Sequence, residues 1–185
     1  SKKLSAVKRK KILEQCQVLF SPQKSDYSPS NRSSKIFLLP FFKNLNVSVM
    51  AQRISSRSID EINILNASLQ AMELSTCKTL RKLAIHGTEE RHHLNILVDG
   101  NKELPLTIFR KDKNLGHLDI TQEALVKGDQ RSSLISLASI VAKEYRDHLM
   151  GRWSEVYPEY QFEKHSGYPT KLHRELIEKY GPSSL

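Results

Sequence analysis

The chain has 185 residues, of which 38% are hydrophobic and 26% are charged. This length and balance are typical of one folded domain with its own core and exclude a largely disordered chain. Its 29 Lys and Arg outnumber its 20 Asp and Glu, which gives a formal net charge of +9. No apolar run approaches the roughly 18 residues that a membrane helix needs, so we expect a cytoplasmic protein rather than a membrane protein.

Neither the cysteines nor the histidines form a zinc-binding pattern. Cys16 and Cys77 are the only cysteines, and neither belongs to a C-x-x-C motif. The seven histidines contain no H-x-x-x-H pair, although His92 and His93 are adjacent. Both cysteines fall on the apolar side of an expected helix, so we expect buried thiols rather than a disulfide or a catalytic nucleophile.

The N-terminal residues predict a basic helix. Ser5 is suited to cap it, and apolar residues recur at imperfect helical spacing up to about Phe20. The first turns carry basic side chains and no acidic ones, namely Lys2, Lys3, Lys8, Arg9, Lys10 and Lys11. Such a surface attracts a polyanion such as nucleic acid by counterion release, but it equally suits the solvated face of a protein kept in solution by its charge. Charge alone leaves both interpretations open.

The middle of the chain mixes loop, strand and helix signals. Residues 21–34 are rich in Ser, Pro and Asn, which predicts a loop; residues 35–45 are ambiguous between helix and strand, and residues 47–54 alternate as a strand does. Ser58 and Glu61 fit a capping box at the start of a helix that we expect to run to about Leu83. The apolar positions expected along this helix are Ile62, Leu65, Leu69, Met72 and Leu80.

Strands and helices alternate again in the second half of the chain. Residues 94–98 and 123–126 predict strands, and residues 104–109 allow a further one. A long helix is predicted from Ser132 to about Trp153, and Thr170 is expected to cap a closing helix. The apolar face expected for the long helix consists of Leu134, Leu137, Ala138, Val141, Tyr145 and Leu149. The alternation predicts an α/β protein with a single domain, residues 1–185, built around one sheet.

Two aspartates lie where predicted strands end. Asp99 follows the apolar stretch of LNILVDG at residues 94–100, and Asp129 ends LVKGD at residues 125–129, just before the long helix. Carboxylates at such positions are suited to hold Mg²⁺ or Mn²⁺, hard cations that keep room for water and phosphate. Asp-Gly is also a favoured hairpin turn, and a carboxylate beside a helix start gains about 0.3–1 kcal/mol from the helix dipole without any metal. Two carboxylates alone would also be a poor match for two divalent ions, whose combined charge needs further acids.

Several short runs occur in one order along the chain, at residues 1–5 (SKKLS), 59–65 (IDEINIL), 98–101 (VDGN), 126–129 (VKGD), 138–143 (ASIVAK), 146–147 (RD), 165–168 (HSGY) and 181–183 (GPS). Each run is weak alone, but together and in this order they closely resemble bacterial ribonuclease HII, the type 2 ribonuclease H. The resemblance covers most of the chain except residues 21–46 and 107–122, which look like insertions. It implies a ribonuclease H-like fold with a mixed sheet flanked by helices.

The resemblance also implies an activity and a set of site residues. It implies an endonuclease that hydrolyses the RNA strand of RNA–DNA hybrids and nicks duplex DNA at embedded ribonucleotides, with Mn²⁺ or Mg²⁺ as cofactor. Asp99 and Asp129 match the third and fourth metal-binding carboxylates of the family, and Tyr168 matches the tyrosine that packs against the sugar at the RNA–DNA junction. The other residues that it assigns to nucleic-acid binding are Lys2, at the position of a phosphate-contacting lysine, and Lys127, Arg131, Ser132 and Lys143 on the polar rim. Asp147 matches no metal ligand and is expected on the helix surface, paired with Lys143.

The chain departs from the family pattern at both ends, and after Leu185 it lacks the basic tail that is usual in the family. It has no strand that carries the family's Asp-Glu pair and Gly-Arg-Gly element, so the N-terminal strands of the fold are expected to be missing. We therefore expect either a segment or short form of a ribonuclease HII with weak or absent cleavage, or a relative that binds duplex nucleic acid without cutting it. A third interpretation, an unrelated basic α/β protein whose aspartates are turn and cap residues, does not explain the ordered runs. No feature indicates oligomerisation, so a monomer is the default expectation.

Overall fold

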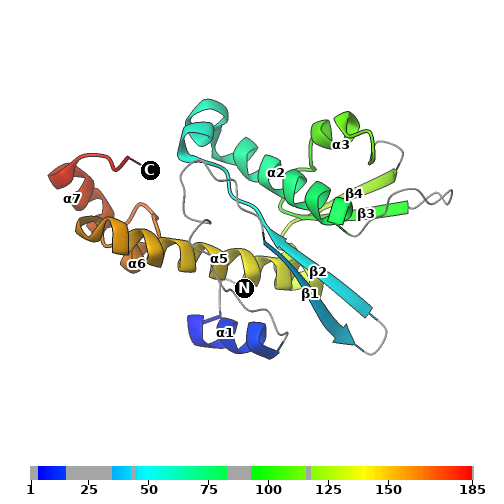
Figure 1. Ribbon diagram of the computed structural model, residues 1–185, viewed down its shortest axis with the longest axis horizontal. Helices are drawn as coiled ribbons and strands as arrows, with labels where there is room; N and C mark the ends of the chain where they lie inside the picture. The colour runs from blue at the N-terminus through cyan, green and yellow to red at the C-terminus, as the bar shows by residue number, and fades with distance from the viewer. Residues whose placement is uncertain (1–3, 16–34, 43–44, 83–92, 116–117, 185) are drawn as a thin grey trace.

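The computed structural model describes residues 4–15, 35–42, 45–82, 93–115 and 118–184. Its helices are α1 (Ala6–Gln15), α2 (Ser56–Lys82), α3 (Thr107–Lys111), α4 (Gly128–Arg131), α5 (Ser133–Val156), α6 (Phe162–His165) and α7 (Lys171–Tyr180), with a 3₁₀ turn, η2, at Pro158–Tyr160. Its strands are β1 (Lys35–Phe42), β2 (Leu45–Ala51), β3 (His93–Asp99) and β4 (Asp119–Leu125). Figure 1 shows the chain arranged around α5, which contacts both β2 and β3.

The N-terminal predictions are met as far as the structure describes them. Helix α1 begins after Ser5, whose Oγ accepts a hydrogen bond from the backbone N–H of Lys8 at 3.4 Å. The expected extension to Phe20, the environment of Cys16 and the loop at residues 21–34 lie outside the described residues. The ambiguous segment at residues 35–45 contains a strand, β1, and the strand expected at residues 47–54 is β2, which begins and ends earlier.

The four strands pair two by two. β1 lies antiparallel to β2, and β3 lies parallel to β4, in a register that runs from His93 opposite Asp119 to Asp99 opposite Leu125. The α/β class is confirmed, with parallel and antiparallel pairs both present. The expectation of one sheet is not met within the described residues, because β2 and β3 are not hydrogen-bonded neighbours and the strands form two two-stranded sheets. Since β3 and β4 run in the same direction, their carboxyl ends meet at one edge.

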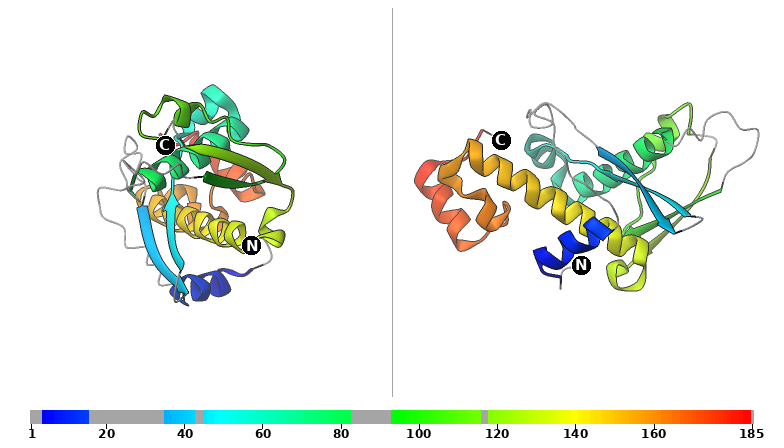
Figure 2. Two further views of the ribbon diagram at one scale, coloured as in Figure 1. Left: turned by 90° about the vertical axis from the view of Figure 1, so that its right-hand side faces the viewer. Right: turned by 60° about the horizontal axis from the view of Figure 1, so that its bottom comes forward.

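Helix α5 is packed against α1 on one side of the molecule and against strands at its N-terminal half. Its residues Ile140 and Val141 form a buried cluster with Leu13 of α1 and Val49 of β2. Figure 2 shows α1 beside α5, and α6 with α7 at the end of α5 that lies away from the strands. This arrangement makes α5 the element that connects the strand ends to the C-terminal helices.

The predicted apolar face of α5 is correct only in part. Leu137 and Val141 are buried as expected, but Leu134 is 59% exposed and Ala138 is also exposed. The buried side of the first turns is formed by Ile135 instead. Apolar residues lie on more than one side of this helix, so their periodicity alone does not single out the side that faces α1 and β2.

The helix start predicted at Ser58 is wrong by about one turn. Helix α2 begins at Ser56, and the cap is Ser55, whose Oγ accepts a hydrogen bond from the backbone N–H of Ser58 at 3.2 Å. Glu61 pairs with Arg57 at 3.2 Å rather than closing a capping box. A second start follows at Asn63, which has φ 65° and whose Oδ1 accepts from the N–H three residues later at 3.1 Å. This break interrupts the helical register, so Leu65 and Met72 of the expected stripe are exposed.

Residues 104–109 do not form the strand that their apolar character allows. Helix α3 starts at Thr107 because Glu73 of α2, which is fully buried, accepts hydrogen bonds from two backbone N–H groups of its first turn at 2.5 and 3.2 Å. A carboxylate at this position satisfies donors that have no partner within a helix.

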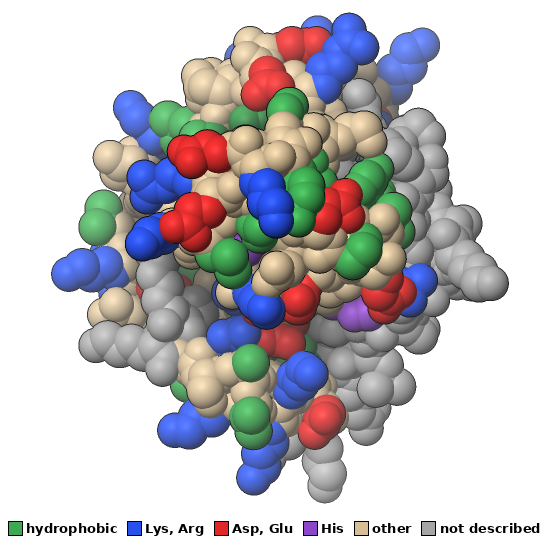
Figure 3. All heavy atoms as spheres, turned by 90° about the vertical axis from the view of Figure 1, so that its left-hand side faces the viewer, with side chains coloured by type: hydrophobic (Ala, Val, Ile, Leu, Met, Phe, Trp, Pro, Cys, Tyr) green, Lys and Arg blue, Asp and Glu red, His purple; other side chains and the backbone are tan. Residues whose placement is uncertain are grey.

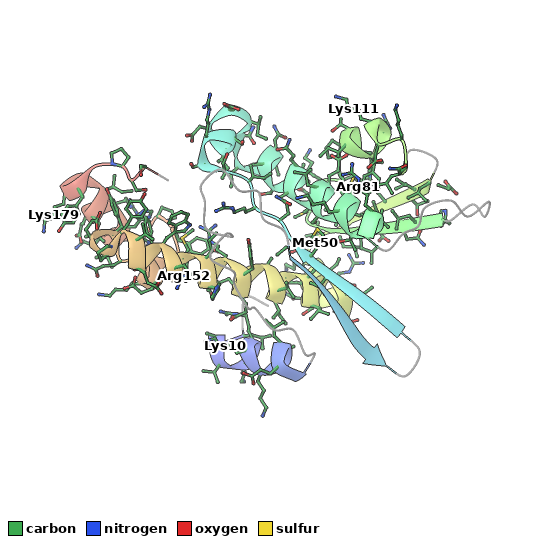
Figure 4. All side chains as sticks on the ribbon, in the orientation of Figure 1. Lys10, Met50, Arg81, Lys111, Arg152 and Lys179 are labelled. Atoms are coloured by element: carbon green, nitrogen blue, oxygen red, sulfur yellow. The ribbon has the colours of Figure 1, made fainter. Side chains whose placement is uncertain are left out.

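Figure 4 shows Arg81 near α3, where its Nη2 lies 2.5 Å from Asp112. The core here consists of Cys77, Leu80, Ile96, Val98, Leu104, Phe109, Leu115 and Leu118, three of them from the segment at residues 107–122.

The thiol of Cys77 lies in this core and makes stability depend on pH. Burial, with a further contribution from the negative charge of Glu73, raises the pKa of Cys77 from 9.0 to about 12. The unfolded chain therefore loses the thiol proton at lower pH than the folded chain, and the free energy of unfolding falls as pH rises between 9.0 and about 12.

We expect Cys77→Ala to remove this pH dependence. Between about pH 8 and about pH 10 the wild-type free energy of unfolding should fall by about 1.4 kcal/mol more than that of the variant, because the unfolded thiol ionises and the folded one does not. Urea unfolding of both proteins at the two pH values measures the difference. Parallel losses in the two proteins would show that Cys77 ionises as readily in the folded chain as in the unfolded one.

The C-terminal helices form a separate aromatic cluster. Trp153 of α5 packs with Tyr160 and Phe162, whose rings are stacked with centroids 5.4 Å apart. The predicted closing helix is α7, and Thr170 caps it as expected by accepting from the N–H of His173 at 3.2 Å.

Among the described residues, no helix combines the length and the apolar character needed to cross a bilayer.

Candidate metal centre and nucleic-acid interface

Asp99 is the last residue of β3 and lies next to the start of α4. Its Oδ1 accepts a hydrogen bond from the backbone N–H of Gly128 at 2.9 Å, and the N–H of Gly100 donates to the carbonyl of Leu125 at 3.0 Å. β3, which ends at Asp99, and β4, which ends at Leu125, are parallel rather than antiparallel. Asp99-Gly100 is therefore not the hairpin turn that the sequence also allowed. The side chain is exposed at the sheet edge.

Asp129 follows Gly128 directly and lies in the first turn of α4, half-buried. Gly128 permits the close approach of the two segments, because a Cβ there would lie 2.8 Å from Cδ1 of Ile135 and 3.2 Å from Oδ1 of Asp99. The structure thus brings Asp99 and the residue next to Asp129 into direct contact across the ends of two parallel strands. Within the described part of the chain, no group of three or more His, Cys, Asp or Glu side chains is placed to hold a metal ion.

Three of the expected nucleic-acid-binding residues surround this edge. Lys127 precedes α4 with φ 55° and is exposed, and Arg131 ends α4 and is also exposed. Ser132 is the N-cap of α5, with its Oγ accepting from the N–H of Ile135 at 3.5 Å. The long helix thus begins where the sequence predicts it, and Ser132 also caps it, a structural role not assigned from the sequence.

Lys143 and Tyr168 meet at a second position on α5. The Nζ of Lys143 lies 5.2 Å from the centroid of the Tyr168 ring and 2.5 Å from Oδ1 of Asp147. Lys143 lies ten positions after Ser133 in α5, a rise of about 15 Å along the helix axis. Lys2, the remaining residue of the expected set, lies outside the described residues.

Asp147 is not the simple surface residue that the sequence suggests. It pairs with Lys143 as expected, but it also accepts from Arg9 Nη2 at 2.9 Å and from Ser166 Oγ at 2.9 Å. Arg9 is 8% exposed and lies 2.6 Å from the buried carboxylate of Glu144. Arg9 stands in an all-basic run that predicts an exposed face, either solvated or bound to a polyanion, so no local signal distinguishes it from its neighbours.

The chain shares substantial sequence with curated ribonucleases. Ribonuclease HII of Alkaliphilus metalliredigens is 42% identical over 132 residues, which are 71% of this chain and 56% of that protein. Ribonuclease HII of Francisella tularensis subsp. novicida is 42% identical over 128 residues, which are 69% of this chain and 57% of that protein. The chain therefore spans little more than half the length of these relatives.

The fold is similar to that of a solved archaeal protein. A chain from the structure of a PCNA–RNase HII complex of Archaeoglobus fulgidus matches 97% of this chain with a TM-score of 0.55, at 17% identity and over 69% of its own length. This likeness concerns the fold and confirms the expected ribonuclease H-like architecture. The family model described as Ribonuclease HII matches residues 1–185. Together with the ordered motifs and the aspartates at the strand ends, this match shows that the chain belongs to the ribonuclease HII family.

Proposed function

We propose that this chain serves in a metal-dependent endonuclease that hydrolyses the RNA strand of RNA–DNA hybrids and nicks duplex DNA at embedded ribonucleotides. The observation that carries the proposal is the hydrogen bond from Gly128 to Asp99, which holds Asp99 and the neighbour of Asp129 together where β3 and β4 end. In a chain of this family, a carboxylate pair at that edge is suited to position a cation at a phosphodiester.

The residues present fit one Mg²⁺ or Mn²⁺ ion. Mg²⁺ is commonly held by one or two carboxylates, with water and substrate phosphate completing its shell, and Asp99 with Asp129 would supply those carboxylates. Such an ion, when bound, would stabilise charge on a phosphoryl oxygen and lower the pKa of a coordinated water. Two ions would need further acidic ligands, and the described residues do not supply a third one at this edge.

Basic side chains offer the phosphate contacts. Lys127 and Arg131 flank the aspartates, Lys143 lies further along α5, and Lys8 and Lys10 are exposed on α1. Each phosphate that such a side chain neutralises releases counterions, so binding should weaken steeply with salt. Figure 3 shows the end of the molecule formed by α6 and α7, where basic and acidic side chains are interspersed. The net charge of +9 therefore does not mark this face as the one that contacts phosphate. Tyr168, 49% exposed, is proposed to contact the sugar at the RNA–DNA junction.

A second function is favoured by the small number of carboxylates. With two acidic ligands and no third one in the described part of the site, the chain is also suited to bind hybrid or ribonucleotide-containing duplexes without cutting them. With either function the protein would act in DNA replication and repair. In a bacterium its duplex substrate lies in the cytoplasm, so the protein would act there.

A nicking assay separates the two functions. The chain is incubated with an end-labelled DNA duplex that contains one ribonucleotide, with Mn²⁺, with Mg²⁺ or with a chelator, and the products are resolved on a denaturing gel. Nicking beside the ribonucleotide that requires the cation, and that is absent from an all-DNA duplex of the same sequence, supports the endonuclease. Retained binding without nicking supports the binding function, and neither binding nor nicking would contradict both.

A further inference from the structure

The side chain of Tyr168 is held between a tight turn and two cations of α5. It follows Ser166 and Gly167, whose φ values of 48° and 71° place both in the left-handed region. The Nζ of Lys143 and the Cζ of Arg146 lie 5.2 and 5.0 Å from the ring centroid, within the range of cation–π interactions. Since 49% of the residue remains exposed, the ring presents a free surface while α5 fixes it from one side.

Arg146 also holds the backbone of the same turn. Its Nε and Nη2 both donate to the carbonyl oxygen of Ser166, at 3.0 and 2.8 Å. The turn lies so close to the guanidinium that a Cβ on Gly167 would be 3.1 Å from Nη2. One side chain therefore contacts both the turn that precedes Tyr168 and the ring of Tyr168 itself.

A second contact ties this turn to α1. The hydroxyl of Ser166 donates to Oδ1 of Asp147 at 2.9 Å, and the other oxygen of Asp147 accepts from Arg9 at 2.9 Å. Ser166 is thus held through its carbonyl by Arg146 and through its hydroxyl by Asp147. Of these two contacts, only the one from Arg146 also extends to the aromatic ring.

We infer that Arg146 is a positioning residue that sets the orientation of Tyr168 toward nucleic acid, and that it acts through the Ser166 carbonyl and the inner side of the ring. The inference rests on the proposed function, because it takes Tyr168 as a contact to the RNA–DNA junction. It differs from a direct phosphate contact, since the guanidinium donors at Nε and Nη2 are directed at the protein's own backbone. Lysine at this position keeps a positive charge but cannot donate twice to one carbonyl in the same planar geometry.

The test compares Arg146→Lys with Tyr168→Ala and with the two changes combined. Dissociation constants are measured, with a chelator present, for a duplex with one ribonucleotide and for an all-DNA duplex of the same sequence. Arg146→Lys should reduce the preference for the ribonucleotide duplex about tenfold, as expected for losing one nucleotide contact to an aromatic ring. The combined variant should show no further loss, because both changes remove the same contact.

Two control variants locate the effect. Arg152→Lys changes an arginine of the same helix that pairs with Glu155 at 2.9 Å, and it should leave the preference unchanged (Figure 4). Ser166→Ala removes the hydroxyl contact to Asp147 but keeps the carbonyl that Arg146 binds, so its effect should be smaller than that of Arg146→Lys. Equal loss of affinity for both duplexes, or losses that add to those of Tyr168→Ala, would show that Arg146 binds nucleic acid itself and would overturn the inference.

Hydrogen exchange tests the same inference without nucleic acid. The N–H groups of Gly167 and Tyr168 donate to His165 Nδ1 at 3.2 Å and to the His165 carbonyl at 2.9 Å. In Arg146→Lys these two amides should exchange at least about tenfold faster, while amides in the middle of α5 keep their rates. Unchanged protection of the turn would overturn the inference. If the wild type showed no preference for ribonucleotides, the proposed function would fail, and exchange would still decide whether Arg146 holds the turn.

Discussion

Replacing Arg9 by methionine is expected to lower the free energy of unfolding by about 3–5 kcal/mol, the range for breaking one side of a buried ion pair. Arg9 is 8% exposed and Glu144 is 6% exposed, with Nε and Oε1 2.6 Å apart. Arg9 also donates to the carbonyl of Leu4 and to Asp147, both at 2.9 Å. Methionine would leave the carboxylate of Glu144 buried without its partner. Urea unfolding of the wild type and the variant measures the loss.

A double-mutant cycle shows whether the loss comes from this pair. Arg9→Met combined with Glu144→Leu should be less destabilised than Arg9→Met alone, because the uncompensated buried charge is removed as well. Arg57→Met is the matched control: its partner Glu61 lies on the same helix at 3.2 Å, and the two side chains are 89% and 60% exposed. Its cost should be about 0.5 kcal/mol or less. A similar small cost for Arg9→Met, or purely additive costs in the cycle, would contradict a coupled buried pair.

The elements that the sequence predicts correctly are those whose ends carry a local signal. β3 ends at Asp99 before a glycine, α5 begins after the cap Ser132, and α7 begins after the cap Thr170. In each case the residues that define the boundary are neighbours along the chain. The end of β3 also places Asp99 at the carboxyl edge of the strand pair, so the position of this carboxylate was predictable from a local pattern, whereas its hydrogen bond to Gly128 joins residues 29 positions apart.

The features that the sequence does not predict depend on partners far along the chain. Helix α3 forms where the sequence allowed a strand, because Glu73, more than thirty residues earlier, caps its first turn. The capping box at Ser58 matches a pattern, but Ser55 lies one turn earlier and takes the same role. Asp147 joins Arg9 and Ser166 through contacts between residues 138 and 19 positions apart. No periodicity or spacing encodes such a contact, so this part of the site emerges only from packing.

Asp99→Asn is expected to abolish cation-dependent nicking and to weaken Mn²⁺ binding by at least about tenfold, with the fold intact. Asparagine keeps an Oδ1 acceptor for the N–H of Gly128, which lies 2.9 Å from Asp99, but it lacks the negative charge that a hard cation prefers. Affinity for duplex nucleic acid should stay the same or rise, since a negative charge near phosphate is removed. Calorimetric Mn²⁺ titration, urea unfolding and duplex binding measure the three properties on the same sample.

Asp99→Ala separates the proposed metal-binding role of this residue from a structural one. Alanine removes the acceptor as well as the charge, so the N–H of Gly128, a buried residue, loses this partner, at a cost of about 1–3 kcal/mol in stability. Asp119→Asn controls for charge alone, because Asp119 opposes His93 at the far end of the same strand pair, and it should not change Mn²⁺ affinity. If Asp99→Asn keeps full Mn²⁺ affinity and only Asp99→Ala has an effect, Asp99 is a structural acceptor for Gly128. The proposed cation site would then have no ligand at the end of β3, and the proposed nuclease function would need a metal held elsewhere.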